Sequence, residues 1–211
     1  MIKDKVICVG EALVDRIVSQ SDNKFTNYFG GAPANVACAL SKLGISSTFI
    51  GRLGNDRFGI EFMQLLNKNK VNTNFLQVDT QHPTRIIKVL VDKDGDRSFS
   101  GFVNEHTKNF ADEMLNKSNI VDSHHTLNQL FKDTKFIITG TIVLANPNSE
   151  ESIHYLLEKA KKFNTKIVID LNWREIFWDK LNFIGQSPTD ELKERIVKFL
   201  EFADLLKLAR E

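Results

Sequence analysis

The sequence has almost no excess charge and no long apolar run. Its 211 residues carry 28 Lys and Arg against 27 Asp and Glu, so it lacks the basic excess typical of nucleic-acid-binding proteins. No apolar stretch approaches the roughly 20 residues that span a bilayer. The opening segment MIKDKVICVGEALVD contains acidic residues where a signal peptide would stay apolar. We therefore expect a cytoplasmic protein with neither a nucleic acid nor a membrane as partner.

The sequence is also poor in residues that form disulfides or bind metals. Only two cysteines occur, Cys8 and Cys38, and both are expected on apolar elements, where a buried free thiol is more common than a disulfide or a ligand. His124 and His125 are adjacent, and no His or Cys spacing resembles a zinc site. We expect both histidines on the surface of a helix and no metal site.

Several motifs of nucleotide-binding proteins and hydrolases are missing. The chain has no G-x-x-x-x-G-K-[ST] phosphate loop, no G-x-G-x-x-G after its first strand and no G-x-S-x-G nucleophile turn. The common dinucleotide-binding and serine-hydrolase classes are therefore disfavoured.

What is present is an alternation of apolar strands with amphipathic helices. The strands are expected at KVICVG, STFIG, KFIITG, KIVID and DLLKL. One helix is expected to bury Val36, Leu40 and Leu43 before Gly44 ends it, and the next to use Phe58, Phe62, Leu65 and Leu66. Further helices are expected from about Ser149 to Phe163 and from about Pro188, the latter with Ser187, Pro188 and Asp190 at its start. This succession predicts an α/β fold with a central, mostly parallel sheet covered on both faces.

Two segments do not fit this alternation. They lie at about 13–29 and 84–103, and the second carries a hairpin signal at Asp94 and Gly95 between arms rich in β-formers. We expect them to form strands outside the main sheet, within a single domain. The chain stops at LLKLARE, just after an expected strand that would normally be followed by a covering helix.

The stretch FGGAPAN, residues 29–35, has the composition of a ligand-binding turn. Gly30 and Gly31 permit a sharp turn or a close approach to a ligand, and Pro33 suits the start of a helix. With Ala32 as the helix cap, the first-turn amides would stay free for an outside acceptor, and Asn35 would add a donor and an acceptor. The alternative is an ordinary glycine turn that packs a helix against the sheet.

Two further places carry polar side chains beyond strand ends. Asp15 follows the first strand, at the edge where parallel sheets bind ligands, and could accept two hydroxyl groups. Alternatively, Glu11 and Asp15 are solvated loop charges. The segment DLNWREIFW places an acid, Asn172 and Arg174 after another strand, which suits an anion site. It could equally be a hydrogen-bonded loop held by its two tryptophans.

Together these motifs resemble the PfkB, or ribokinase-like, carbohydrate kinases, and within them the fructokinase-like branch. FGGAPANVACALSKLGISSTFIGRLGNDRFG is similar to the family's first signature, and VGEALVD to its opening strand with the substrate aspartate. DGDRSF resembles the lid hairpin, and DLNWREIFW resembles the D-x-N-x-R loop. The resemblance covers essentially all 211 residues.

The resemblance implies a three-layer ribokinase-like sandwich with a small β-lid built from residues 13–29 and 84–103. It implies an ATP- and Mg²⁺-dependent kinase for a ketohexose such as fructose, with the lid as a possible homodimer interface. Asp15, Gly30, Gly31 and Asn35 would bind the sugar, and Asn172 and Arg174 would lie near the phosphate or another anionic group.

The chain also departs from the family pattern. The second signature, G-A-G-D, whose aspartate is the catalytic base, is absent from the 211 residues, so that base is expected beyond Glu211. We therefore expect an N-terminal portion that binds sugar, binds neither ATP nor Mg²⁺ tightly, and is inactive alone or pairs with a C-terminal half. The alternatives are a non-catalytic sugar-binding or interaction module and a decayed gene product.

Overall fold

The computed structural model describes residues 5–19, 24–91, 97–103, 107–178 and 188–208. Its strands are β1 Lys5–Val9, β2 Leu13–Ser19, β3 Phe25–Gly30, β4 Ser46–Ile50, β5 Arg52–Gly54, β6 Gln77–Asp79, β7 Ile86–Val91, β8 Arg97–Phe102, β9 Thr134–Gly140, β10 Lys166–Asp170 and β11 Leu205–Lys207. Its α-helices are α1 Ala32–Lys42, α2 Arg57–Lys68, α3 Lys117–Asp122, α4 His124–Lys132, α5 Pro147–Lys162 and α6 Asp190–Leu200. Short 3-10 helices lie at η1 Ala111–Met114, η2 Ile142–Ala145 and η3 Glu175–Phe177.

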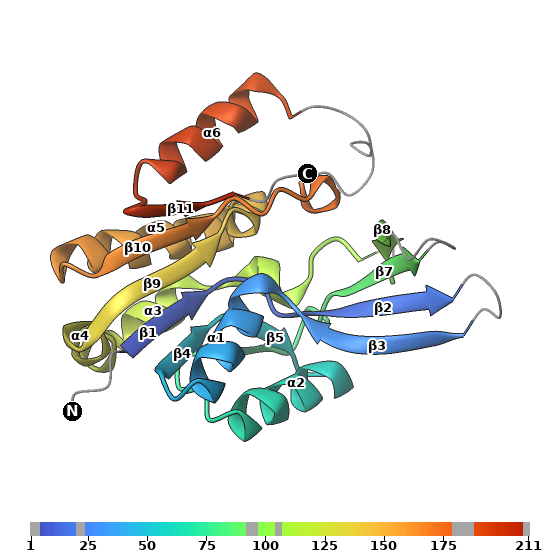
Figure 1. Cartoon of the computed structure of the whole chain (residues 1–211), viewed down its shortest axis with the longest axis horizontal. Coiled ribbons are helices and arrows are strands. Elements are labelled where there is room, and N and C mark those ends of the chain that lie inside the picture. Colours follow the sequence, from blue (N-terminus) through green and yellow to red (C-terminus); the bar gives the residue numbers. More distant parts are fainter. Residues whose placement is uncertain (1–4, 20–23, 92–96, 104–106, 179–187, 209–211) are drawn as a thin grey trace.

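The main sheet has five parallel strands in the order β11-β10-β9-β1-β4 (Figure 1). Successive side chains of β1 point to opposite faces of the sheet, and both of these faces are buried at β1. Ile7 and Val9 pack with α3, α4, α5 and α6 in one cluster, while Val6 and Cys8 pack with α1 and α2 in another. The predicted central parallel sheet with helices on both faces is thus confirmed.

Part of the second face has no covering helix among the described residues. Phe136 of β9 pairs with Val6, and its side chain is 41% exposed. Leu205 of β11 pairs with Val168, and its side chain is 61% exposed. We call this apolar region, formed by Phe136, Val168 and Leu205, the open face.

The two segments expected outside the main sheet hold the strands of a second sheet, in the order β3-β2-β7-β8. β2 and β3 are antiparallel, β7 and β8 are antiparallel, and β2 and β7 run parallel in the middle. Figure 1 shows this sheet extending from one end of the main sheet. The turn expected at Asp94 and Gly95 lies outside the described residues, but the antiparallel arms on either side of it are present.

The buried face of α1 differs from the expected one. The helix buries the small residues Pro33, Ala34 and Ala37, while Val36 and Leu40 are only partly buried. Leu43 lies just past the helix and is 77% exposed. Small side chains let the helix approach β1 and β4 closely, which a pattern of large apolar residues does not reveal. Gly44 follows with a φ of 82°, the left-handed geometry that ends many helices.

The start of α6 also differs from the expectation. Thr189 caps the helix, because its hydroxyl oxygen accepts a hydrogen bond of 3.2 Å from the Leu192 amide. Pro188 therefore lies before the cap instead of in the first turn, and Ser187 lies outside the described residues. Asp190 is in the first turn as expected.

The expectation of free, buried or partly buried cysteines agrees with the structure, and so does the helical surface position of His125. Cys8 is fully buried, Cys38 is partly buried, and both are free thiols. His125 lies exposed on α4, whose first residue is His124. In the described part of the chain, no helix combines the length and apolar character needed to cross a membrane.

Candidate functional site

The glycine turn joins the second sheet to α1. Gly30 ends β3, and Gly31 is the N-cap of α1 with a φ of 101°. A Cβ atom at Gly31 would lie 2.4 Å from the backbone oxygen of Glu11, closer than any real contact. Both the positive φ and the close approach therefore require glycine here.

Asp15 lies directly against this turn. It sits within β2, opposite Tyr28 of β3, so it belongs to a strand and not to a loop. A Cβ atom at Gly30 would lie 2.6 Å from Oδ2 of Asp15, which places the carboxylate over the glycine backbone. The structure thus brings together three of the four residues predicted to bind substrate.

Asn35, the fourth predicted residue, is exposed in the first turn of α1. Its backbone N–H donates to the Gly31 carbonyl oxygen over 2.9 Å, so it is tied to the same turn. The expectation for Ala32 was wrong, however. Gly31 and not Ala32 is the cap, and the Ala32 N–H donates to Oε1 of Glu11 over 2.9 Å, so this amide is not free for an outside acceptor.

Glu11 is the residue that sequence reasoning missed. It lies two residues past the end of β1 and is 3% exposed, so the interpretation of Glu11 as a solvated loop charge was wrong. Burial raises the pKa of Glu11 to about 7, against the opposing effects of the Ala32 amide and Arg85. A glutamate between a buried strand and the apolar ALV segment was the signal in the sequence that could have indicated it.

The segment after β10 has a different geometry. Oδ2 of Asp170 pairs with Nζ of Lys207 at 2.7 Å, and Asn172 has a φ of 34°. The rings of Trp173 and Trp178 stack with centroids 5.4 Å apart. The stacked tryptophans agree with the reading of this segment as a loop anchored by its aromatic residues.

Arg174 nevertheless reaches the second sheet. Its Nη1 donates to the Trp173 carbonyl oxygen over 2.8 Å, and its guanidinium carbon lies 5.9 Å from the ring centre of Phe99 on β8. Phe99 pairs with Val89, and Asp15 pairs with Ile87 on the same strand β7. Because residues two apart on a strand share a face, Asp15 and Phe99 face the same side of the second sheet. The two predicted sites therefore open onto one side of this sheet.

A buried ionic cluster lies at the junction of the two sheets. Arg85, just before β7, is 1% exposed and pairs through Nη2 with Oδ2 of Asp112 at 3.0 Å and with Oε1 of Glu113 at 3.3 Å. The rings of Phe102, Phe110 and Phe177 surround its guanidinium at 4.7–5.5 Å. Burial, with Glu113 nearby, raises the pKa of Asp112 to about 6 although Arg85 lowers it. No motif in the sequence indicated this cluster.

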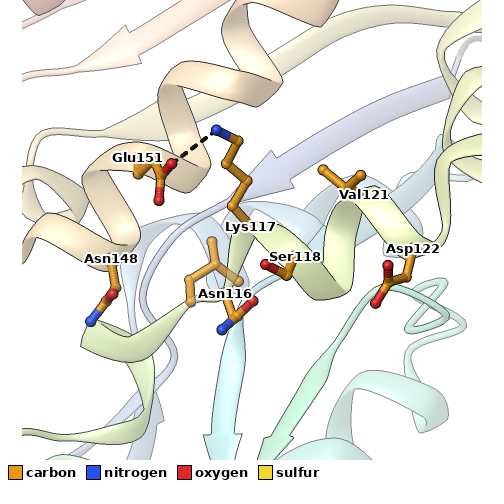
Figure 2. A pocket seen from close by; sticks show the side chains of 8 residues that line it. Asn116, Lys117, Ser118, Val121, Asp122, Asn148 and Glu151 are labelled. Carbon is orange, nitrogen blue, oxygen red and sulfur yellow. Dashed lines mark hydrogen bonds and ion pairs between the residues drawn. The ribbon is translucent and has the colours of Figure 1, made fainter.

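Two surface hollows lie away from the predicted residues. One, of about 290 Å³, lies between α3 and α5 and includes the Lys117–Glu151 ion pair of 2.9 Å (Figure 2). Its lining residues are Leu115, Asn116, Lys117, Ser118, Val121, Asp122, Asn148 and Glu151. The other, of about 330 Å³, lies between β3 and α2 and is lined by Val14, Phe25, Thr26, Asn27, Tyr28, Phe29, Arg57, Phe58 and Glu61. Neither contains a residue predicted to bind substrate or phosphate.

The chain is similar in sequence to known fructokinases. The fructokinase of Vibrio alginolyticus is 30% identical over 208 residues, which cover 99% of this chain and 61% of that protein. The probable fructokinase-5 of Arabidopsis thaliana is 30% identical over 210 residues, which cover 97% of this chain and 59% of that protein. The chain thus spans about three-fifths of the length of these relatives.

Solved structures show the same fold. The Xylella fastidiosa fructokinase matches with a TM-score of 0.79 and 27% identity, covering 97% of this chain and 59% of that one. A Vibrio cholerae O395 fructokinase double mutant with fructose, ADP and potassium bound matches with a TM-score of 0.75 and 28% identity, covering 98% and 60%. The model of the pfkB family carbohydrate kinases matches residues 3–210. The chain therefore belongs to the pfkB family of carbohydrate kinases.

Proposed function

We propose that this chain supplies the sugar-binding part of an ATP-dependent kinase that phosphorylates a ketohexose such as fructose. The observation that carries the proposal is the position of the Asp15 carboxylate against the backbone of Gly30, beside the Gly31 turn with its positive φ. The fructokinases among the relatives, and the Vibrio cholerae structure with fructose and ADP bound, support the choice of sugar.

The chemistry of these residues suits a neutral polyhydroxyl ligand. An ionised Asp15 accepts hydrogen bonds from two neighbouring hydroxyl groups, and such charge-assisted bonds are stronger than neutral ones. Gly30 and Gly31 have no side chain, so a sugar can reach the backbone there. Asn35 offers a donor and an acceptor at the exposed first turn of α1. Together these groups orient the hydroxyl that is to be phosphorylated.

Asn172 and Arg174 are proposed to lie near the transferring phosphate or an anionic group of the substrate. The support is the forked guanidinium of Arg174, which suits phosphate oxygens, and its location beside Phe99 on the Asp15 side of the second sheet. The same sheet, whose strands β2, β3, β7 and β8 lie in the segments expected to form the lid, 13–29 and 84–103, is proposed to act as a lid over the sugar.

We do not assign the phosphoryl-transfer step to these residues. Among the described residues, no group of three or more His, Cys, Asp or Glu side chains could hold a metal ion. The 211 residues also lack the G-A-G-D motif expected to provide the base. ATP would supply the phosphoryl group and Mg²⁺ would neutralise its charge. We propose that neither binds this chain tightly and that the chain alone has negligible turnover.

The proposal is tested by titrating fructose into the Asp15→Asn variant. Loss of the negative charge should weaken fructose binding by about tenfold or more, because a charge-assisted hydrogen bond contributes about 1.5–3 kcal/mol. The matched control is Asp190→Asn, which changes an exposed aspartate on α6 that pairs with Lys193. Equal affinities in the wild type, the control and Asp15→Asn would contradict the assignment of Asp15.

A second candidate function is an interaction module. Two observations favour it: the open face of the main sheet and the exposed Phe25 and Tyr28 on β3, the edge strand of the second sheet. The first would suit pairing with a C-terminal half, and the second would suit a homodimer through the lid. Light scattering on a size-exclusion column distinguishes these forms from a monomer, which would count against this candidate.

A further inference from the structure

Glu11 makes two contacts with the glycine turn that the proposed function does not use. Its Oε1 accepts the Ala32 N–H over 2.9 Å. Its backbone oxygen lies only 2.4 Å from the position that a Cβ atom would take at Gly31, so it leaves no room for a side chain there. One residue in the segment between β1 and β2 thus contacts the turn through both its side chain and its main chain.

The turn needs such an external anchor. Glycine has the greatest backbone freedom of all residues, so Gly30 and Gly31 do not hold a single geometry by themselves. Pro33 has no N–H, which leaves Ala32 as the helical amide next to the turn that an acceptor can hold. A buried carboxylate is a strong acceptor for this amide because the surrounding dielectric constant is low.

The environment of Glu11 also points to a role beyond packing. A carboxylate is costly to bury, and Oε2 has no hydrogen-bond partner within the part of the chain that the structure describes. The charged groups that act on it are Arg85, just before β7, and Asp112 of η1. An apolar residue of similar size would avoid this cost but would leave the Ala32 amide without its partner.

We propose that Glu11 is a positioning residue that holds the Gly30–Gly31 turn in the geometry that binds the sugar. This inference rests on the proposed function for its ligand, and on the two contacts of Glu11 for its mechanism. Glu11 does not touch the sugar. It acts through the Ala32 amide and through the backbone of Gly31.

The test compares Glu11→Ala and Glu11→Gln with the control Glu61→Gln, which alters an exposed glutamate paired with Arg57 on α2. Fructose affinity is measured by calorimetry, and exchange of the Ala32 amide hydrogen is measured by NMR. Glu11→Ala should weaken fructose binding about fivefold or more, because losing a capping acceptor typically shifts the equilibrium of an ordered helix start by about that factor. Exchange of the Ala32 amide should also become about fivefold faster or more in Glu11→Ala. Glutamine keeps an acceptor oxygen, so Glu11→Gln and the control should stay within about twofold of the wild type in both measurements.

The outcomes separate this inference from the proposed function. Unchanged fructose affinity or unchanged Ala32 exchange in Glu11→Ala would overturn the positioning role. If the wild type bound no fructose while Ala32 exchange still rose in Glu11→Ala, the proposed function would fail but the anchoring of the turn would stand. If Glu11→Ala did not fold, Glu11→Met would decide, because methionine keeps the size of the side chain but offers no carboxylate acceptor to the Ala32 amide. It should weaken fructose binding and speed Ala32 exchange in the same way, and no change in either measurement would overturn the role.

Discussion

Glu11 and Asp15 are carboxylates four residues apart in very different surroundings. Glu11 is buried against the start of α1, whereas Asp15 is half-buried on β2 beside Gly30. The difference follows from their places in the fold, because Glu11 lies just past the core strand β1 and Asp15 lies on a sheet with an open side. The sequence made Asp15 a candidate from its place after a strand but could not distinguish a buried glutamate from a solvated one.

Glu11 gives the stability of the protein a defined pH dependence. Its folded pKa of about 7 lies above the ordinary value of 4.5, so the folded state holds the proton more tightly than the unfolded state does. Glu11 therefore lowers the free energy of unfolding as pH rises from about 4.5 to about 7, by up to about 3 kcal/mol. Glu11→Gln removes this titration.

The measurement is urea unfolding of the wild type and Glu11→Gln across pH 4.5–8. The difference in unfolding free energy should change over this interval in favour of the glutamine variant and level off above pH 7. Parallel curves for the two proteins would show that Glu11 titrates normally.

At the scale of elements, the glycine turn can be compared with another glycine of positive φ. Gly31 has a φ of 101° with the Glu11 carbonyl in the way, whereas Gly44 has a φ of 82° with nothing within 4 Å of its Cβ position. Gly44→Ala should lower the free energy of unfolding by about 1 kcal/mol, from backbone strain alone. Gly31→Ala should lower the free energy of unfolding clearly more. It should also weaken fructose binding, because the turn must move.

Thermal unfolding and fructose titration of both glycine variants check this comparison. Equal losses of stability in the two variants, with fructose binding unaffected in both, would mean that the close approach at Gly31 does not matter.

Arg85 forms ion pairs with residues of η1, so replacing it should lower the free energy of unfolding strongly. Arg85→Met would leave Asp112 and Glu113 buried without their cation, which typically costs about 3–5 kcal/mol. Adding Asp112→Asn to Arg85→Met should recover part of that loss, because one buried charge is removed. Denaturant unfolding of the single and double variants measures the recovery, and strictly additive losses would contradict the ionic account.

The elements themselves were largely predictable, but some of their contacts were not. The strands of the main sheet followed from short apolar runs such as KIVID, which became β10. The buried face of α1 did not follow from the spacing of large apolar residues, because close packing favoured Ala34 and Ala37 over the larger Leu43. The Arg85 cluster was unpredictable because its members lie 27 and 28 positions apart in the chain, and only the fold brings them together.

At the scale of the whole molecule, the open face of the main sheet should add to self-association wherever no partner chain covers it. Phe136→Glu places a charge on this face, where the native side chain is 41% exposed, so folding should tolerate it. We expect the variant to self-associate less than the wild type at the same concentration, with little change in stability. The control is Leu43→Glu, which alters an exposed leucine beyond α1.

Light scattering over a concentration series provides the measurement for these two variants. A fall in the apparent mass with Phe136→Glu, but not with Leu43→Glu, is the expected result. The same mass for both variants and the wild type would show that the open face is not an interaction surface.

We propose that these 211 residues contain a working sugar site. Calorimetric titration of the purified wild-type chain with fructose, in the absence of nucleotide, measures this binding itself. Saturable binding at one site per chain is the predicted result. Absence of fructose binding by a chain that unfolds cooperatively would contradict the claim.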